Sequence, residues 1–194
     1  MNYTPNTRSQ ASVWLKPYYY SRAAFSIVWV AAAFTIGRTN PAVAAILLMV
    51  YPAWDALANL FDAHRNGGMK RNPTQALNVV ASGVTTAAVA IALGISMNAV
   101  LGVFGTWAIL AGLFQLGTGV RRWKSAGAQW AMILSGAQSA LAGAFFIKTA
   151  AGSQVPGITD FAPYAAFGAF YFLISAISLS MADLRRAKER RLQA

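Results

Sequence analysis

The sequence contains no cysteine, one histidine and only five acidic residues among its 194. The missing cysteines exclude disulfides, thiolate metal sites, covalently attached haem and a cysteine nucleophile. The histidine, His64, has no second histidine or acidic cluster at metal-ligand spacing, and is expected to be solvated. No glycine-rich turn is followed by Lys-Ser or Lys-Thr, and no serine has a plausible histidine–acid pair. The sequence therefore predicts no enzyme, no cofactor and no metal site.

Charged residues are also scarce, at 11% of the chain, whereas average soluble domains carry about 25%. Hydrophobic residues reach 57%, and long charge-free windows alternate with short basic clusters. This pattern is typical of an all-α polytopic membrane protein. The net charge of +11 would suggest nucleic acid in a soluble protein. Here its distribution follows the membrane topology, so no nucleic-acid partner is expected.

The apolar windows predict six transmembrane helices, at about 20–37, 41–62, 74–94, 99–120, 129–150 and 161–181. They pair into three hairpins at about 20–62, 74–120 and 129–181 within a membrane domain at 20–183. Residues 1–19 are expected to be a cytoplasmic or interfacial segment, and residues 184–194 a basic cytoplasmic tail. No signal-peptide pattern precedes the first window, so that helix is expected to remain.

Aromatic residues before the first window are typical of a headgroup belt. Trp14, Tyr18, Tyr19 and Tyr20 stand close to cations, including Arg22, whose side chain is expected to snorkel to the interface.

The basic residues predict the orientation of the chain. All but two of its 16 lysines and arginines fall on the side that holds both termini, and the exceptions are Arg38 and Lys148. Because lysine and arginine accumulate on the cytoplasmic side, both termini are expected in the cytoplasm of a bacterial inner-membrane protein. The expected partners are the bilayer, anionic lipids at the cytoplasmic face, and a membrane-protein partner or a second copy of the chain.

An internal repeat relates the helices to one another. Residues 51–61 align with residues 104–114 at an offset of 53, and the same offset places residues 82–83 on residues 135–136. A further shift of 63 brings the second copy onto residues 167–171. Each hairpin crosses the membrane twice, so the copies are parallel repeats. A pseudo-threefold bundle of three hairpins is the simplest arrangement.

Particular segments of the second and third hairpins resemble the HdeD family of small bacterial inner-membrane proteins. They are Trp-Ala-Ile-Leu-Ala-Gly-Leu-Phe-Gln-Leu at 107–116, Arg-Arg at 121–122, Gln-Trp at 129–130, Leu-Ser-Gly at 134–136 and Leu-Ala-Gly at 141–143. The resemblance is best over about 97–150 and extends over about 20–183. It implies six helices built from a short repeat of unknown function, and a link to acid resistance. It supplies no catalytic residues.

A polar stripe interrupts the apolar window at 41–62. Asp55, Asn59 and Asp62 are spaced i, i+4, i+7 and so share one helical face. A carboxylate at membrane depth costs about 3 kcal/mol or more unless it finds a partner or a proton. Pro52, one turn away, is expected to kink the helix.

The repeat extends this polar face to the other even-numbered helices. Equivalent positions hold small or polar residues: Ala108, Gly112 and Gln115 in one helix, and Tyr171, Ser175 and Ser178 in the other. If these faces meet, Asp55 should find Gln115, Tyr171 or Ser175. The candidate intramembrane polar site therefore comprises Asp55, Asn59, Gln115, Tyr171 and Ser175.

Each feature has a structural and a functional interpretation. Asp55 is either a proton-linked site or a hydrogen-bonded packing residue, and Asp62 is expected at the interface near Arg65. Gly105 and Gly112, with Gly119 at the same heptad spacing, are expected to form packing grooves.

Three functions follow from these interpretations. The first is a non-enzymatic membrane protein that supports acid or stress tolerance by scaffolding or altered permeability to protons or small solutes. The second is a small proton-coupled transporter or channel centred on Asp55. The third is a structural, partner-binding membrane subunit.

Overall fold

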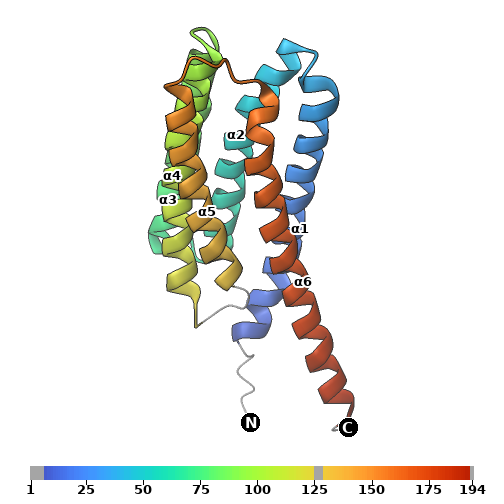
Figure 1. The fold of residues 1–194 in the computed structure, drawn as a ribbon. Helices are drawn as coiled ribbons and strands as arrows, with labels where there is room; N and C mark the ends of the chain where they lie inside the picture. The colour runs from blue at the N-terminus through green and yellow to red at the C-terminus, as the bar shows by residue number, and fades with distance from the viewer. Residues whose placement is uncertain (1–6, 125–128, 193–194) are drawn as a thin grey trace.

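The computed structural model describes residues 7–124 and 129–192, which form six long helices joined by short connections (Figure 1). The long helices are α1 (Thr7–Ala32), α2 (Pro41–Arg65), α3 (Pro73–Leu93), α4 (Met97–Arg122), α5 (Gln129–Ala150) and α6 (Ala162–Leu192). Short helical turns lie at η1 (Ala33–Gly37), η2 (Met69–Arg71) and η3 (Ile158–Phe161). Each of the six long helices contributes to a span that is long and apolar enough to cross a membrane. The expected all-α, six-helix membrane architecture is confirmed.

The helix starts follow from local sequence. The Asn40 side chain accepts hydrogen bonds from the backbone N–H groups of Ala42 and Val43, and Pro41 occupies the first helical position. Ser96 caps α4 in the same manner. Between α2 and α3, Gly67 and Gly68 adopt φ values of 93° and 89°, which favour glycine. These turns let the chain reverse within a few residues.

The six helices form one bundle in which α2 to α5 each pack beside the next helix in the chain, and α1 packs along α6. The most extensive contacts join α4 with α5 and α1 with α6, which belong to different predicted hairpins. By contrast, the backbones of α1 and α2 come close at few positions, and α2 approaches the preceding segment mainly at η1. The hairpins are therefore not the packing units of the bundle. Both described ends of the chain lie at the same end of the molecule, and α6 projects beyond the other helices there (Figure 1).

Glycines explain why α4 and α5 approach so closely. A Cβ added to Gly112 would lie 2.5 Å from the carbonyl oxygen of Gly136, and one added to Gly105 would lie 2.7 Å from that of Gly143. Gly119 similarly faces Ile133 at 3.0 Å. The expected glycine packing groove on α4 is confirmed, and α5 supplies a matching pair of glycines.

The first helix differs from its prediction. It begins at Thr7 instead of near Tyr20, and the rings expected in a headgroup belt partly face the bundle. Tyr18 and Tyr19 are 8% and 1% exposed, and the Tyr19 hydroxyl donates to the sulfur of Met132 at 3.0 Å. Only Tyr20 of the three tyrosines is exposed. Aromatic content was a poor guide here, because the buried face has the 3.6-residue period of a helix that starts earlier.

Candidate functional site

Asp55 lies inside the bundle and forms an ion pair with Arg22 of α1. Asp55 is only 6% exposed, and the Arg22 side chain is 13% exposed. The prediction that Arg22 snorkels to the headgroups is therefore wrong. Arg22 points inward because a buried carboxylate offsets the cost of keeping its charge away from water.

Three further side chains hold the other oxygen of the Asp55 carboxylate. Its Oδ2 accepts hydrogen bonds from Asn59 Nδ2 at 3.1 Å, from Asn78 Nδ2 at 2.9 Å and from Ser82 Oγ at 2.9 Å. Ser82 Oγ in turn accepts from the indole Nε1 of Trp107 at 2.8 Å. One carboxylate thus links α1, α2 and α3 directly, and α4 through Ser82.

The Arg22 guanidinium is also enclosed by aromatic groups. Its Nη1 donates to the Tyr18 hydroxyl at 3.0 Å, and its central carbon lies 4.3 Å from the centroid of the Phe172 ring on α6. A cation over an aromatic face is stabilised by the ring quadrupole, and more so where water is excluded. Arg22 therefore connects the Asp55 site to α6.

The expected partners of Asp55 are replaced by others. Gln115 donates to the backbone oxygen of Met132 at 3.3 Å, and Ser175 donates to that of Tyr171 at 2.9 Å. Neither they nor Tyr171 hydrogen-bonds Asp55 within the described residues. The stripe of Asp55 instead faces α3, whose Asn78 and Ser82 meet it at helical spacing.

A cavity of about 70 Å³ nevertheless brings most of the predicted site together. Asp55, Asn59, Gln115 and Tyr171 all line it, whereas Ser175, 1% exposed, is packed outside its lining.

The cavity also borders polar atoms that lack a partner in the described part of the chain, namely Arg22 Nε and Asn78 Oδ1. A buried water needs about 10–15 Å³ and two or more polar partners. The cavity therefore suits a small group of waters next to the ion pair.

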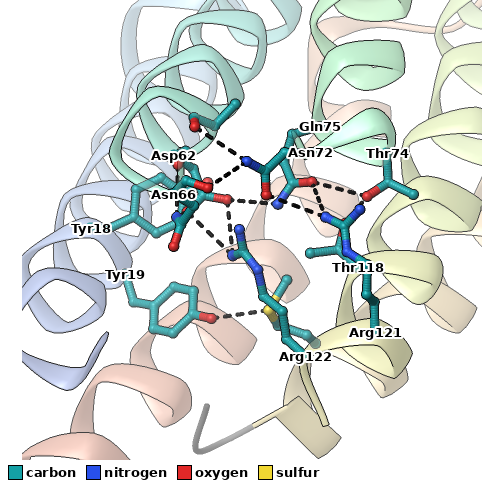
Figure 2. A network of polar contacts seen from close by, with 12 residues as sticks. Tyr18, Tyr19, Asp62, Asn66, Asn72, Thr74, Gln75, Thr118, Arg121 and Arg122 are labelled. Carbon is teal, nitrogen blue, oxygen red and sulfur yellow. Dashed lines mark hydrogen bonds and ion pairs between the residues drawn. The ribbon is translucent and has the colours of Figure 1, made fainter. Parts of the chain in front are cut away.

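A second buried ion pair lies two helical turns from the first, between Asp62 of α2 and Arg122 of α4 (Figure 2). The N–O distance is 3.0 Å, and Asp62 is only 3% exposed. Asp62 also accepts from Gln75 Nε2 at 3.1 Å and from Asn66 Nδ2 at 2.8 Å. The expected partner Arg65 is replaced by Arg122, and Gln75 of α3 also donates to Asp62, whereas the interfacial depth of Asp62 stays a prediction.

This second cluster continues across the end of the bundle. Arg121 Nη2 donates to Gln75 Oε1 at 2.8 Å and to Asn72 Oδ1 at 3.4 Å (Figure 2). The hydroxyls of Thr74 and Thr118 hydrogen-bond at 2.7 Å. Asp62, Arg122 and Thr118 also line the cavity, so polar groups extend from this basic end to Asp55.

At its other end the cavity meets an aromatic cluster. Tyr51 and Tyr164 border both, and their rings pack against Phe104 and Trp107 with centroid separations of 5.8–6.3 Å. Phe161 extends this cluster and is fully buried. The bundle interior is thus polar on the side of the termini and apolar on the opposite side.

Pro52 lies one turn from Asp55 and is fully buried. Helix α2 continues through it from Pro41 to Arg65, although proline has no N–H to donate to the Leu48 carbonyl. The kink at Pro52 stays a prediction.

The sequence did not predict four residues of the site: Arg22, Asn78, Trp107 and Arg122. One available signal was charge balance, because two intramembrane carboxylates require two cations, and Arg22 lies inside the first apolar window while Arg122 follows the fourth within two residues. Another was the helical spacing of Asn78 and Ser82. Within the described residues, no three histidine, aspartate or glutamate side chains gather as metal ligands do.

Residues 77–148 match a family described as a short repeat of unknown function (DUF308). The match spans most of α3, all of α4 and most of α5. It also includes residues 125–128, which lie outside the described structure. It therefore includes the close glycine contact and the α3 half of the Asp55 site, but neither Arg22 nor Asp55. No curated protein and no solved structure matched the chain. A DUF308 short repeat is thus found in the middle of a six-helix membrane protein.

Proposed function

We propose that this is a non-enzymatic, HdeD-like protein of the bacterial inner membrane that supports acid or stress tolerance by passing protons or a small polar solute. The observation that carries the proposal is the Asp55–Arg22 ion pair, which lies beside a polar cavity and is separated from the far side by the aromatic cluster. The DUF308 repeat supports the HdeD-like assignment, and acid tolerance follows from that resemblance.

The size of the cavity limits what can pass. Pockets for drug-sized ligands measure about 300–1,000 Å³, whereas this cavity has about 70 Å³. Water, protons and very small solutes fit that volume. Two carboxylate–arginine pairs along the cavity leave its wall neutral overall, which disfavours strong attraction of either sign of ion.

The proposed step is an exchange of partners at Asp55. A proton arriving through the polar end binds the carboxylate and neutralises it, which releases the Arg22 guanidinium from its ion pair. Arginine keeps its charge throughout. Tyr18 and Phe172 already hold the guanidinium and would stabilise it in the released state. The aromatic cluster must then rearrange for passage to the far side.

A scaffolding function is the alternative, and the saturation of Asp55 favours it. Both carboxylate oxygens are engaged, by Arg22 on one side and by Asn59, Asn78 and Ser82 on the other. Hydrogen bonds from three helices to one carboxylate hold those helices together. In that case the ion pair stabilises the fold and leaves permeability unchanged.

Proton flux into vesicles separates the two functions. Reconstituted protein should raise the flux under an inward pH gradient above the leak of empty vesicles, and Asp55→Asn should return it to that leak. Asp160→Asn is the matched control, since it removes an exposed carboxylate in η3. A wild-type flux equal to that of empty vesicles would exclude proton permeation, and acid survival of a deletion strain carrying Asp55→Asn would then test scaffolding.

We also propose that both termini lie in the cytoplasm. Exposed cations on the described ends include Arg65, Lys70 and Arg71 beside the termini, whereas Arg38 and Lys148 lie at the opposite end. A reporter that is active only in the periplasm should be silent after the C-terminus and active when inserted at residues 151–157. The reverse pattern would invert the orientation.

A further inference from the structure

A groove of about 660 Å³ opens between α1 and α2 on the outer face of the bundle. It has room because the backbones of these two helices approach each other closely at few positions. Its lining is mostly apolar and includes Trp14, Pro17, Trp54, Ala58 and Phe61.

Two aromatic pairs connect the helices that flank the groove. Trp14 and Phe61 pack across the two helices with ring centroids 4.8 Å apart, and Phe25 and Trp54 do so at 4.8 Å with nearly parallel planes. Between the pairs the floor contains the small residue Ala58. The floor and walls of the groove between these pairs are therefore mostly apolar.

The length of the groove matches one leaflet of a bilayer. From Trp54 to His64 the lining of α2 covers ten residues, or about 15 Å at 1.5 Å per residue. The hydrocarbon core of a bilayer is about 30 Å thick, so half of it is about 15 Å. Leu57 and Leu60, both lining residues, are 60% and 43% exposed on the bundle surface. The groove therefore faces the acyl chains of a single leaflet.

A cation stands at the outer end of this groove. The Arg65 guanidinium lies 5.1 Å from the centroid of the Trp14 ring and 5.4 Å from that of Phe61. Arg65 is exposed and forms no ion pair with any carboxylate in the described residues. Guanidinium groups bind phosphate oxygens in bidentate geometry.

We propose that the groove binds one anionic phospholipid, with an acyl chain between α1 and α2 and the phosphate on Arg65. The rings of Trp14 and Trp54 line the groove and offer apolar surface to the acyl chain. Charge complementarity at Arg65 and the one-leaflet length select this occupant over a soluble peptide.

The bound lipid also reaches the polar site through one residue. Tyr18 lines both the groove and the inner cavity, and its hydroxyl accepts a hydrogen bond from Arg22. A chain in the groove packs against the outer side of this ring. Lipid occupancy is therefore expected to hold Tyr18 in contact with Arg22.

Native mass spectrometry of delipidated protein titrated with phosphatidylglycerol or phosphatidylcholine tests the proposal. The wild type should retain one phosphatidylglycerol at concentrations where phosphatidylcholine is lost. Arg65→Gln should weaken phosphatidylglycerol retention about tenfold, as expected for the loss of about 1.4 kcal/mol from one charged contact. Lys70→Gln, which removes an exposed cation from η2 at the same end, should leave it unchanged. Equal losses in the two variants would indicate general surface attraction and overturn the site.

A second variant tests the groove itself. Ala58→Phe should fill the floor and abolish retention of the first phosphatidylglycerol, while Leu113→Phe, an exposed position on α4, should not. The melting temperature without lipid identifies folded variants. Folded Ala58→Phe protein that still retains the lipid would overturn the proposal. If Ala58→Phe does not fold, Arg65→Gln and Lys70→Gln decide it. Lipid retention does not depend on proton flux, so this test and the test of the proposed function can fail separately.

Discussion

Replacing Arg22 by methionine should lower the free energy of unfolding by about 3–5 kcal/mol, because it leaves Asp55 as an unpaired buried carboxylate. Methionine keeps most of the apolar stem, so the loss reports the charge more than the volume. The measurement is thermal or denaturant unfolding in detergent micelles. Arg38→Met is the matched control. Arg38 is exposed at the other end of the bundle, and its replacement should cost less than about 0.5 kcal/mol.

A double-mutant cycle makes the prediction specific to the ion pair. Asp55→Asn in the Arg22→Met background removes the uncompensated charge, so the double variant should be more stable than Arg22→Met alone. The asparagine can still accept from Asn78 and Ser82 through its carbonyl oxygen. Additive losses would contradict the assignment of Arg22 and Asp55 as partners.

The architecture could be predicted from sequence because its cause is local. Predominantly apolar windows of about 20 residues determine the spans, and features such as Asn40-Pro41 and Gly67-Gly68 determine where they end. The glycine spacing on α4 predicted a close helix contact for the same reason, since heptad spacing places glycines on one face. The N-terminal start of α1 was not predicted, because its first turns carry polar residues and precede the first long apolar window.

The partners of the polar site could not be predicted in the same way. Helical spacing shows that Asp55, Asn59 and Asp62 share a face, but it does not show which helix that face meets. The repeat suggested a meeting of α2 with α4 and α6, whereas the observed contacts join α2 to Arg22 of α1 and to Ser82 of α3. Long-range packing decides such contacts, and the relative rotation of helices leaves little trace in one sequence.

The repeat does explain how the two halves of the bundle differ. At the offset of 53, Ala108 of α4 is equivalent to Asp55, and Ser135 of α5 is equivalent to Ser82. The α4–α5 interface is therefore equivalent to the α2–α3 interface. The same kind of interface is thus formed twice. Between α2 and α3 it is held by charged hydrogen bonds, and between α4 and α5 by backbone contact at glycines. The polar site occupies the copy that has Asn59 at the position where the other copy has Gly112.

This difference predicts opposite effects for one substitution at equivalent positions. Gly83 of α3 and Gly136 of α5 are related by the repeat offset. A Cβ on Gly136 would lie 2.7 Å from the Gly112 carbonyl oxygen, whereas one on Gly83 would meet nothing within 4 Å. Gly136→Ala should therefore destabilise the protein by about 3 kcal/mol, the upper range for over-packing, because backbone cannot move aside without separating α4 from α5.

Gly83→Ala should instead raise the melting temperature, because alanine is favoured over glycine by about 1 kcal/mol inside a helix. Thermal unfolding of the two variants under identical detergent conditions measures the contrast. Equal effects of the same sign would show that helix propensity, not contact between helices, governs both positions. The expected opposite signs would instead show that the α4–α5 contact stabilises the bundle because Gly112 and Gly136 have no side chains. The first repeat copy has Asn59 at the position equivalent to Gly112.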